Sequence, residues 1–221
     1  SGFAMRDAIA AIASGRSKIT VACGIEKMSD LPRERNRLWL GVSGDVEWER
    51  LAGTNFAGIY AMMARRHMND YGTKKEQITF VAVKNRNNAV ANPKAQFRAP
   101  LDIERAMKAP NLASPLSFSD ACGITDGASM AILCRADMAK IFTDQPILIV
   151  GSGAASDYVA VHDRPSMTTL EATVRAAQEA YQMAGLTADD IDFAEVHDCF
   201  AIAELLAYED LGFCKKGAAG K

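Results

Sequence analysis

Short apolar segments alternate with amphipathic helical segments at both ends of this 221-residue chain. Residues 19–25, 127–135 and 147–153 are apolar runs of strand length, and residues 168–185 repeat apolar side chains at helical spacing. An apolar run without polar alternation is typical of a strand buried on both faces of a parallel sheet. Strands that alternate with helices place those helices on both faces of the sheet. The chain is therefore predicted to be an α/β protein built on a parallel sheet.

Residues 30–117 interrupt this alternation. Asn and Arg become frequent there, and two helical patterns, at 56–72 and 74–85, are followed by a stretch that Pro93 and Pro100 break into a loop. We interpret residues 30–117 as an insertion over the rim of the sheet.

The ends of the helices carry local signals. Gly72 and Gly185 follow helical patterns and predict C-caps, because glycine adopts the left-handed conformation at little cost. Thr168 or Thr169 is predicted to be the N-cap of the helix that Gly185 ends.

The composition limits the classes of partner. Charged residues make up 24% and the net charge is −2, so neither nucleic acid nor a membrane is predicted as a partner. No apolar run approaches the roughly 20 residues of a membrane-spanning helix, and the pattern of a signal peptide does not follow Ser1. The five cysteines include no CxxC pair, so no metal site is predicted, and a reducing, cytoplasmic compartment fits best.

Both ends of the sequence stop within the alternating pattern. Residues 1–29 predict helix, turn and strand with no strand ahead of them, and residues 212–221 form a glycine-rich tail without a closing element. We expect both ends to continue in a longer protein. An intact small α/β domain that starts with a helix is the alternative.

The segment that carries the most chemical information contains His197, Asp198 and Cys199, between a predicted strand and a predicted helix. Reactive groups of α/β proteins lie beyond the carboxyl ends of strands, and a helix N-terminus stabilises a thiolate. An imidazole beside such a thiol can hold a water or donate to an oxyanion. The alternative is structural: a satisfied histidine, an N-cap aspartate and a packed cysteine. The residues alone leave both interpretations open.

Other polar residues give weaker signals. His67 is predicted to lie on a helix surface, and His162 to have a structural role beside Asp163. The GSG at 151–153 lacks the remaining elements of a dinucleotide fingerprint. Four arginines are candidates for phosphate contacts or for a solvated face: Arg33, Arg35, Arg37 and Arg86.

Several separated motifs resemble, in order, those of sterol-carrier-protein-type thiolases and their acetyl-CoA acetyltransferase relatives. EVHDCFAIAELLAYEDLGF resembles the HDCF segment of that family, and VAVKNRNNAVANPKAQF resembles its KNHxNxxxNPxAQF segment. ITDGASMAIL and GSGAASDYVAVHDR resemble two further segments, and SGFAMRDAIAAIASGRSKITVACGIEKMSD resembles the helix and strand after the nucleophilic cysteine. The resemblance covers nearly the whole chain.

The resemblance implies a five-layered α/β/α/β/α thiolase fold, of which this chain is a part. Residues 1–144 would be the remainder of the N-terminal half, with 30–117 as its inserted loop domain, and residues 145–221 the first part of the C-terminal half. It implies acyl-CoA or CoA as ligand, no further cofactor, a homodimer or tetramer, and for some relatives a small OB-fold partner protein.

The resemblance also implies Claisen condensation of acyl-CoA, or thiolytic cleavage of 3-ketoacyl-CoA, through a cysteine thioester. His197 matches the residue that helps to build an oxyanion hole, and Cys199 matches the residue that takes the acid/base role. The nucleophilic cysteine would lie two residues before Ser1, and a further histidine beyond Lys221, so the chain as given is expected to lack both.

Two departures from the family pattern limit the transfer. Arg86 stands where relatives often have His, and Gly123 stands where Pro is common. A thiolase-like acyl-CoA retro-aldolase is one alternative, although such relatives tend to use tyrosines where this chain has His197 and Cys199. A non-catalytic subunit that binds acyl-CoA or scaffolds a partner enzyme is the other.

Overall fold

A computed structural model describes residues 2–221, except for the side chains at positions 33 and 37. The phosphate contacts considered for Arg33 and Arg37 therefore lie outside the described side chains. The described helices are α1 (Gly2–Ala13), α2 (Arg33–Gly41), α3 (Phe56–Tyr71), α4 (Lys75–Ala89), α5 (Ile103–Met107), α6 (Glu171–Ala184) and α7 (Ala201–Asp210). The described strands are β1 (Ile19–Glu26), β2 (Asn111–Ala113), β3 (Leu116–Ser117) and β4 (Gly127–Cys134).

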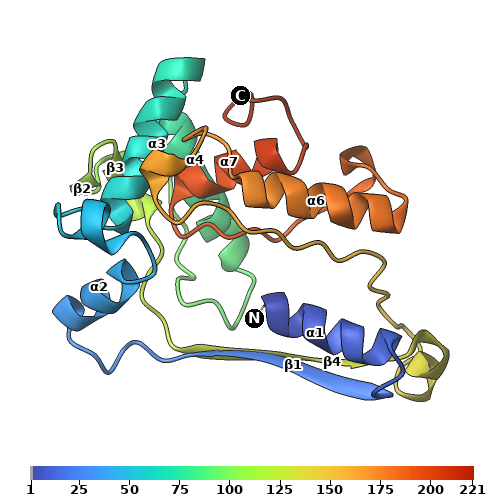
Figure 1. Cartoon of the computed structure of the whole chain (residues 1–221). Coiled ribbons are helices and arrows are strands. Elements are labelled where there is room, and N and C mark those ends of the chain that lie inside the picture. Colours follow the sequence, from blue (N-terminus) through green and yellow to red (C-terminus); the bar gives the residue numbers. More distant parts are fainter. Residues whose placement is uncertain (1) are drawn as a thin grey trace.

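Strands β1 and β4 pair as a two-stranded antiparallel ribbon along one side of the molecule (Figure 1). Ala22 lies opposite Ala131, and Ala8 of α1 packs with Ala22 and Leu133 on one face of the ribbon. The strands predicted at 19–25 and 127–135 are thus confirmed as β1 and β4, but the parallel pairing predicted for the sheet is wrong within residues 2–221. Apolar runs identify strands, but they do not determine the direction of pairing.

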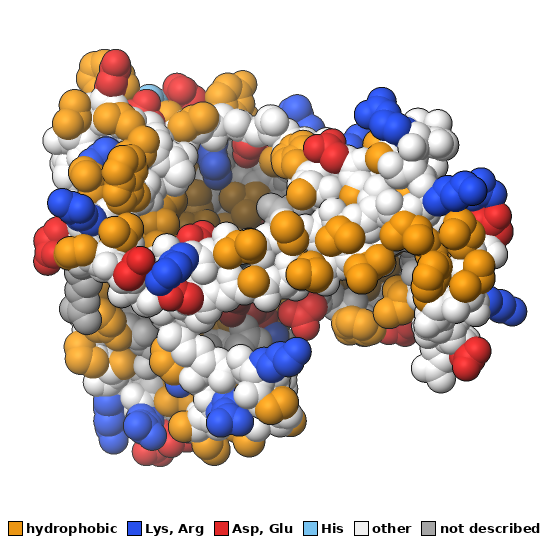
Figure 2. Space-filling view, turned by 90° about the horizontal axis from the view of Figure 1, so that it is seen from below, with side chains coloured by type: hydrophobic (Ala, Val, Ile, Leu, Met, Phe, Trp, Pro, Cys, Tyr) orange, Lys and Arg blue, Asp and Glu red, His pale blue; other side chains and the backbone are white. Residues whose placement is uncertain are grey.

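The opposite face of this ribbon is apolar and exposed. Val21, Ile25, Met130 and Ile132 are each more than half exposed there. Figure 2 shows hydrophobic side chains spread over this side of the molecule, which is seen from below. The apolar runs that predicted burial on both faces are therefore covered on one face only by the described residues.

Two further predicted strands are not formed within residues 2–221. The apolar run 147–153 and the segment leading to His197, which was predicted to be a strand, pair with no strand, and Ile147 is 95% exposed. A strand needs a hydrogen-bonded neighbour, and neither segment has one in the described part of the chain.

The main hydrophobic core lies between α3, α4 and α7, which cross in the upper part of Figure 1. Ala64 of α3, Ile78 of α4, and Ile202 and Leu206 of α7 are fully buried in it. The small side chain of Ala64 lets the backbone of α3 approach its neighbours closely. This core, rather than the β ribbon, supports the segment that contains His197 and Cys199.

The glycine signals at the helix ends are confirmed, and the threonine signal is wrong. Gly72 and Gly185 follow α3 and α6 with φ of 72° and 68°. The N-cap of α6 is Leu170, which has no side-chain cap. Its amide donates to Asp210 at 2.8 Å, so a carboxylate from α7 satisfies one of the free amides at the start of α6.

His67 is buried, contrary to the predicted surface position. Its Nδ1 lies 2.8 Å from the Thr73 hydroxyl, and its Nε2 lies 3.2 Å from both carboxylate oxygens of Glu209. Glu209 also accepts from the amides of Gly217 and Ala219. Because His67 occupies the face of α3 that turns toward α7, it helps to hold the glycine-rich tail against both helices.

Among residues 2–221, none of the helices has the length and apolar character needed to cross a bilayer.

The core between α3, α4 and α7 predicts a large difference between two identical substitutions. Ile202→Ala is expected to lower the free energy of unfolding by about 2–5 kcal/mol, since it leaves a cavity around a fully buried side chain. Ile147→Ala at a 95% exposed position is expected to change it by less than about 0.5 kcal/mol. Urea unfolding of both variants measures this, and equal losses would show that the two positions are buried alike.

Candidate active site

The segment with His197, Asp198 and Cys199 runs extended into α7, which begins at Ala201. It is held by a neighbouring segment that is distant in sequence. Ala121 and Phe200 form an antiparallel bridge, and the Cys122 amide donates to the Cys199 carbonyl at 3.0 Å. The backbone at Cys199 is therefore fixed by pairing, although no regular strand precedes it.

Cys199 is half-buried, and its thiol lies near the hydroxyl of Tyr60 from α3. The Tyr60 ring stacks on Phe200 with ring centroids 4.8 Å apart. Burial raises the pKa of the Cys199 thiol, the Tyr60 hydroxyl lowers it, and Cys122 and Asp198 raise it further, so that the pKa lies above its usual value. Burial and the neighbouring Cys199 also raise the pKa of Tyr60, which therefore stays a hydrogen-bond donor at neutral pH.

His197 and Asp198 point to different environments. His197 is exposed, and its imidazole has no hydrogen-bond partner among the described side chains. Asp198 accepts a hydrogen bond from the Asn85 amide of α4 at 2.8 Å. Asp198 is not the N-cap of α7, a position that Phe200 occupies. The structure thus places Cys199 inward and His197 at the surface of the same short segment.

A buried carboxylate on α7 organises the contact between that segment and α4. Glu204 is 2% exposed and accepts from the Asn85 amide at 2.6 Å. It also pairs with the Lys84 ammonium and the Tyr208 hydroxyl, and Lys84 donates to Tyr208 at 2.8 Å. Asn85 therefore bridges Glu204 and Asp198, so that the position of Asp198 follows the packing of two helices.

A second buried carboxylate holds the segment on the other side of the bridge. Asp120 is 2% exposed and accepts from Thr79 at 2.8 Å and from the Ser117 amide at 2.6 Å. The Lys75 ammonium completes its surroundings. Because Asp120 precedes the bridge residue Ala121, this network fixes the chain that pairs with Phe200.

A hollow of about 270 Å³ opens beside this arrangement. Its lining includes Asn85, Asp198 and Cys122, together with Phe97 and Gly123. The site segment therefore borders a cavity through Asp198, whereas His197 and Cys199 are not part of its lining.

Several of these residues are not found by motif reasoning. The contacts around Cys199 and Asp198 come from Tyr60, Asn85 and Glu204. The first two lie more than 100 residues earlier in the sequence, and Glu204 lies within the helix that follows the motif. A signal was present for one of them. Glu204 and Tyr208 are polar residues four apart on a helix whose first seven residues are otherwise apolar, and four apart is the spacing of a side-chain pair.

Within residues 2–221, no group of three or more His, Cys, Asp or Glu side chains is arranged to hold a metal ion. All five cysteines are free thiols.

The family of the chain is clear from comparison with known proteins. Residues 1–111 match the family model "Thiolase, N-terminal domain", and residues 153–221 match "Thiolase C-terminal domain-like". The chain belongs to the thiolase family, and the predicted partial thiolase fold is confirmed. The residue boundaries predicted for the two halves and for the loop domain stay predictions.

The relatives include archaeal enzymes. The chain is 47% identical over 220 residues to an acetyl-CoA acetyltransferase of Methanothermobacter thermautotrophicus, covering 100% of this chain and 57% of that protein. It is 41% identical over 220 residues to one of Methanocaldococcus jannaschii, covering 99% of this chain and 56% of that protein. The chain thus spans a little over half the length of these relatives.

A solved structure, described as the Ltp2-ChsH2(DUF35) aldolase, is also similar. It matches with a TM-score of 0.86 and 28% identity, over 98% of this chain and 57% of that chain.

The Tyr60 hydroxyl beside Cys199 predicts a shift in thiol reactivity. Tyr60→Phe removes a donor to the thiolate, so the pKa of Cys199 is expected to rise and its alkylation to need a higher pH. Iodoacetamide labelling from pH 7 to 10, quantified for the Cys199 peptide by mass spectrometry, measures this. Tyr158→Phe, at an exposed tyrosine, is the matched control. Coinciding pH profiles for the two variants would rule out the hydroxyl's influence on the thiol.

The Glu204 network predicts a specific loss of stability. Glu204→Gln keeps the side-chain volume but loses an acceptor for Lys84 and Asn85, and is expected to cost about 1–3 kcal/mol in unfolding free energy. Glu195→Gln at an exposed position is the control and is expected to lie within about 0.5 kcal/mol of the parent. Chemical denaturation of both proteins tests this, and a neutral Glu204→Gln would mean that the carboxylate does not organise the contact.

Proposed function

We propose that the protein is an acyl-CoA acyltransferase of the thiolase type, acting on 3-ketoacyl-CoA and acyl-CoA in the cytoplasm. One observation carries the proposal: a half-buried Cys199 thiol, beside the Tyr60 hydroxyl, lies in the segment that matches the family's acid/base cysteine. The names of the two archaeal acetyl-CoA acetyltransferases support the same chemistry.

The properties of Cys199 suit a proton acceptor. Burial lowers its thiolate fraction at neutral pH, but a thiolate of raised pKa is a stronger base. In the condensation direction, Cys199 would take a proton from the α-carbon of acetyl-CoA. The resulting carbanion attacks the carbonyl of an acyl group held as a thioester on a second, nucleophilic cysteine. The C–S bond to that cysteine breaks, the cysteine leaves as thiolate, and 3-ketoacyl-CoA is released.

His197 is proposed to act on the thioester oxygens. An exposed imidazole is free to donate, directly or through a water, to an oxygen that gains negative charge in each tetrahedral step. The nucleophilic cysteine of these steps is proposed to be the one that the thiolase family motif supplies. Thiolysis is the same sequence of steps in reverse, with free CoA attacking the enzyme thioester after C–C cleavage.

A second candidate function is cleavage of an acyl-CoA side chain by a retro-aldol reaction. It is favoured by the similarity to the structure named as an aldolase, whose name also includes a DUF35 partner. A small partner protein of that kind is accordingly proposed for this chain, as is a homodimer or tetramer. A non-catalytic subunit that binds acyl-CoA is the remaining alternative.

Acetoacetyl-CoA thiolysis by the full-length protein tests the main proposal. Cys199→Ala is expected to lower kcat by about 10²–10⁴-fold, because general acid–base catalysis contributes that much. Cys134→Ala, near the far end of the β ribbon, is the matched control and is expected to keep the parent rate.

The outcomes separate the candidates. Full turnover in Cys199→Ala would remove Cys199 from the mechanism. Aldol cleavage without thiolysis would favour the second function, and CoA binding without either reaction would favour a non-catalytic subunit.

A further inference from the structure

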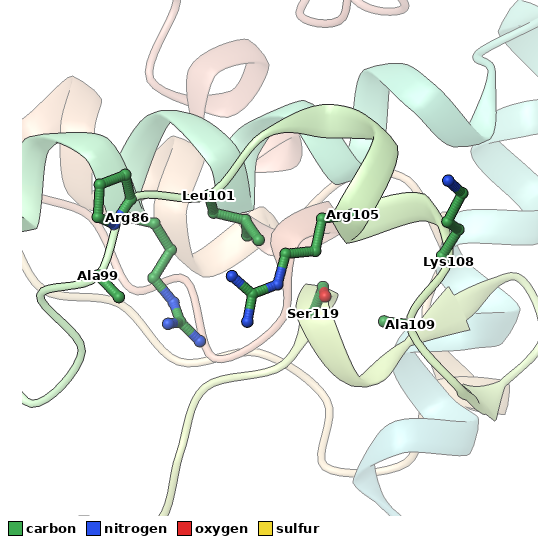
Figure 3. A pocket seen from close by; sticks show the side chains of 8 residues that line it. Arg86, Ala99, Leu101, Arg105, Lys108, Ala109 and Ser119 are labelled. Carbon is green, nitrogen blue, oxygen red and sulfur yellow. The ribbon is translucent and has the colours of Figure 1, made fainter.

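A second hollow, of about 410 Å³, lies between α4, α5 and the segment 99–101. Its lining includes Arg86 of α4, Arg105 of α5, Lys108 and Ser119, and no acidic residue. Figure 3 shows the Arg86 and Arg105 side chains reaching into the same space between Leu101 and Ser119, while the Lys108 ammonium points away from them. Two guanidinium groups therefore face one hollow.

These cations have no acidic partner in the described part of the chain. None of the ion pairs formed by the described side chains includes Arg86, Arg105 or Lys108. Burial, and then the charge of Arg105, lower the pKa of Arg86, as expected for a cation without a neighbouring carboxylate. Like charges that face each other favour the entry of an anion between them.

The Arg86 guanidinium is held in place by an aromatic ring. It lies over the Phe97 ring, 4.0 Å from the centroid. Phe97 in turn occupies the space next to Gly123, where an added Cβ would come within 2.8 Å of the ring. The two departures from the family pattern, Arg86 and Gly123, are thus joined through Phe97.

This hollow is connected with the candidate active site. Arg86 and Ser119 line both it and the 270 Å³ hollow that Asp198 borders. An extended ligand with its reactive end near Asp198 would therefore have the two guanidinium groups along its path.

We propose that Arg86 and Arg105 together bind an anionic oxygen group, a phosphate or a carboxylate, carried by the acyl-CoA ligand. Each guanidinium presents a fork of N–H donors that matches two oxygens of such a group. Lys108 adds positive charge at the edge of the hollow. The inference rests on the proposed function, since it assumes that the ligand is a CoA thioester.

Three groups supply this chemistry: the 3′-phosphate of the CoA nucleotide, its 5′-diphosphate, and a carboxylate at the end of a dicarboxylic acyl group. Calorimetric titration of the full-length protein with CoA, dephospho-CoA, acetyl-CoA and succinyl-CoA separates them. Arg105→Gln is the test variant, because Arg105 is exposed and its replacement leaves the core untouched. Arg16→Gln, an exposed arginine beyond the end of α1, is the control.

We expect Arg105→Gln to raise Kd about 10–100-fold for the ligands that carry the recognised group, because a charge-assisted pair is lost. A loss for CoA but not for dephospho-CoA identifies the 3′-phosphate, and an equal loss for all four ligands identifies the 5′-diphosphate. A loss confined to succinyl-CoA identifies the carboxylate. Arg86→Gln is expected to follow the same pattern, and Arg16→Gln to bind like the parent.

Parent-like affinities of Arg105→Gln and Arg86→Gln for all four ligands would overturn the anion site and leave the proposed function intact. A parent protein that binds none of the four ligands would instead refute the proposed function, and the site with it.

Discussion

The buried carboxylate of Glu204 controls how the two helices around the candidate site meet. A charge taken out of water is costly unless it is paired and hydrogen-bonded, so Glu204 requires the donors that α4 presents. Lys84 and Asn85 supply them and so fix the position of α4 along α7. Asn85 also donates to Asp198. The pairing that buried Glu204 requires therefore also fixes the segment 197–199, where chemistry is proposed.

A second carboxylate repeats this arrangement from the other direction. Asp120 is buried against α4 and precedes the residue that bridges to Phe200. Both segments of the bridge are thus tied to the same helix, and Cys199 is held where they meet. The backbone that carries the thiol is positioned by hydrogen bonds tied to the helical core, which is the support that a precisely placed proton acceptor needs.

The helices could be predicted from the sequence because their signals are local. Apolar spacing and a following glycine define α3 and α6 within a few residues. Strand pairing is not local, so the apolar run 147–153 predicted a strand that has no partner among the described residues. The thiolase fold was predicted from the resemblance of the motifs to that family, and the periodicity of apolar residues alone did not predict it.

The candidate site was predictable only in part for the same reason. The HDC motif at 197–199 is contiguous and visible in the sequence, but Tyr60 reaches Cys199 from a helix about 140 residues earlier. His67 was predicted to lie at the surface because Arg65 and Arg66 precede it, but it is buried. The carboxylate of Glu209, 142 residues away, pairs with the His67 ring and makes the buried position favourable. Polar contacts between distant helices leave no pattern in the sequence of either helix.

The close approach of Phe97 to Gly123 has a consequence for how this protein can diverge. Any larger residue at 123 would force the ring to move, and the ring is the platform on which Arg86 rests. The effect of a substitution at position 97, 123 or 86 therefore depends on the residues at the other two. A proline at 123 requires the aromatic ring at 97 to move, and the side chain at 86 must then change or take another position. Related sequences are expected to change these positions together rather than one at a time.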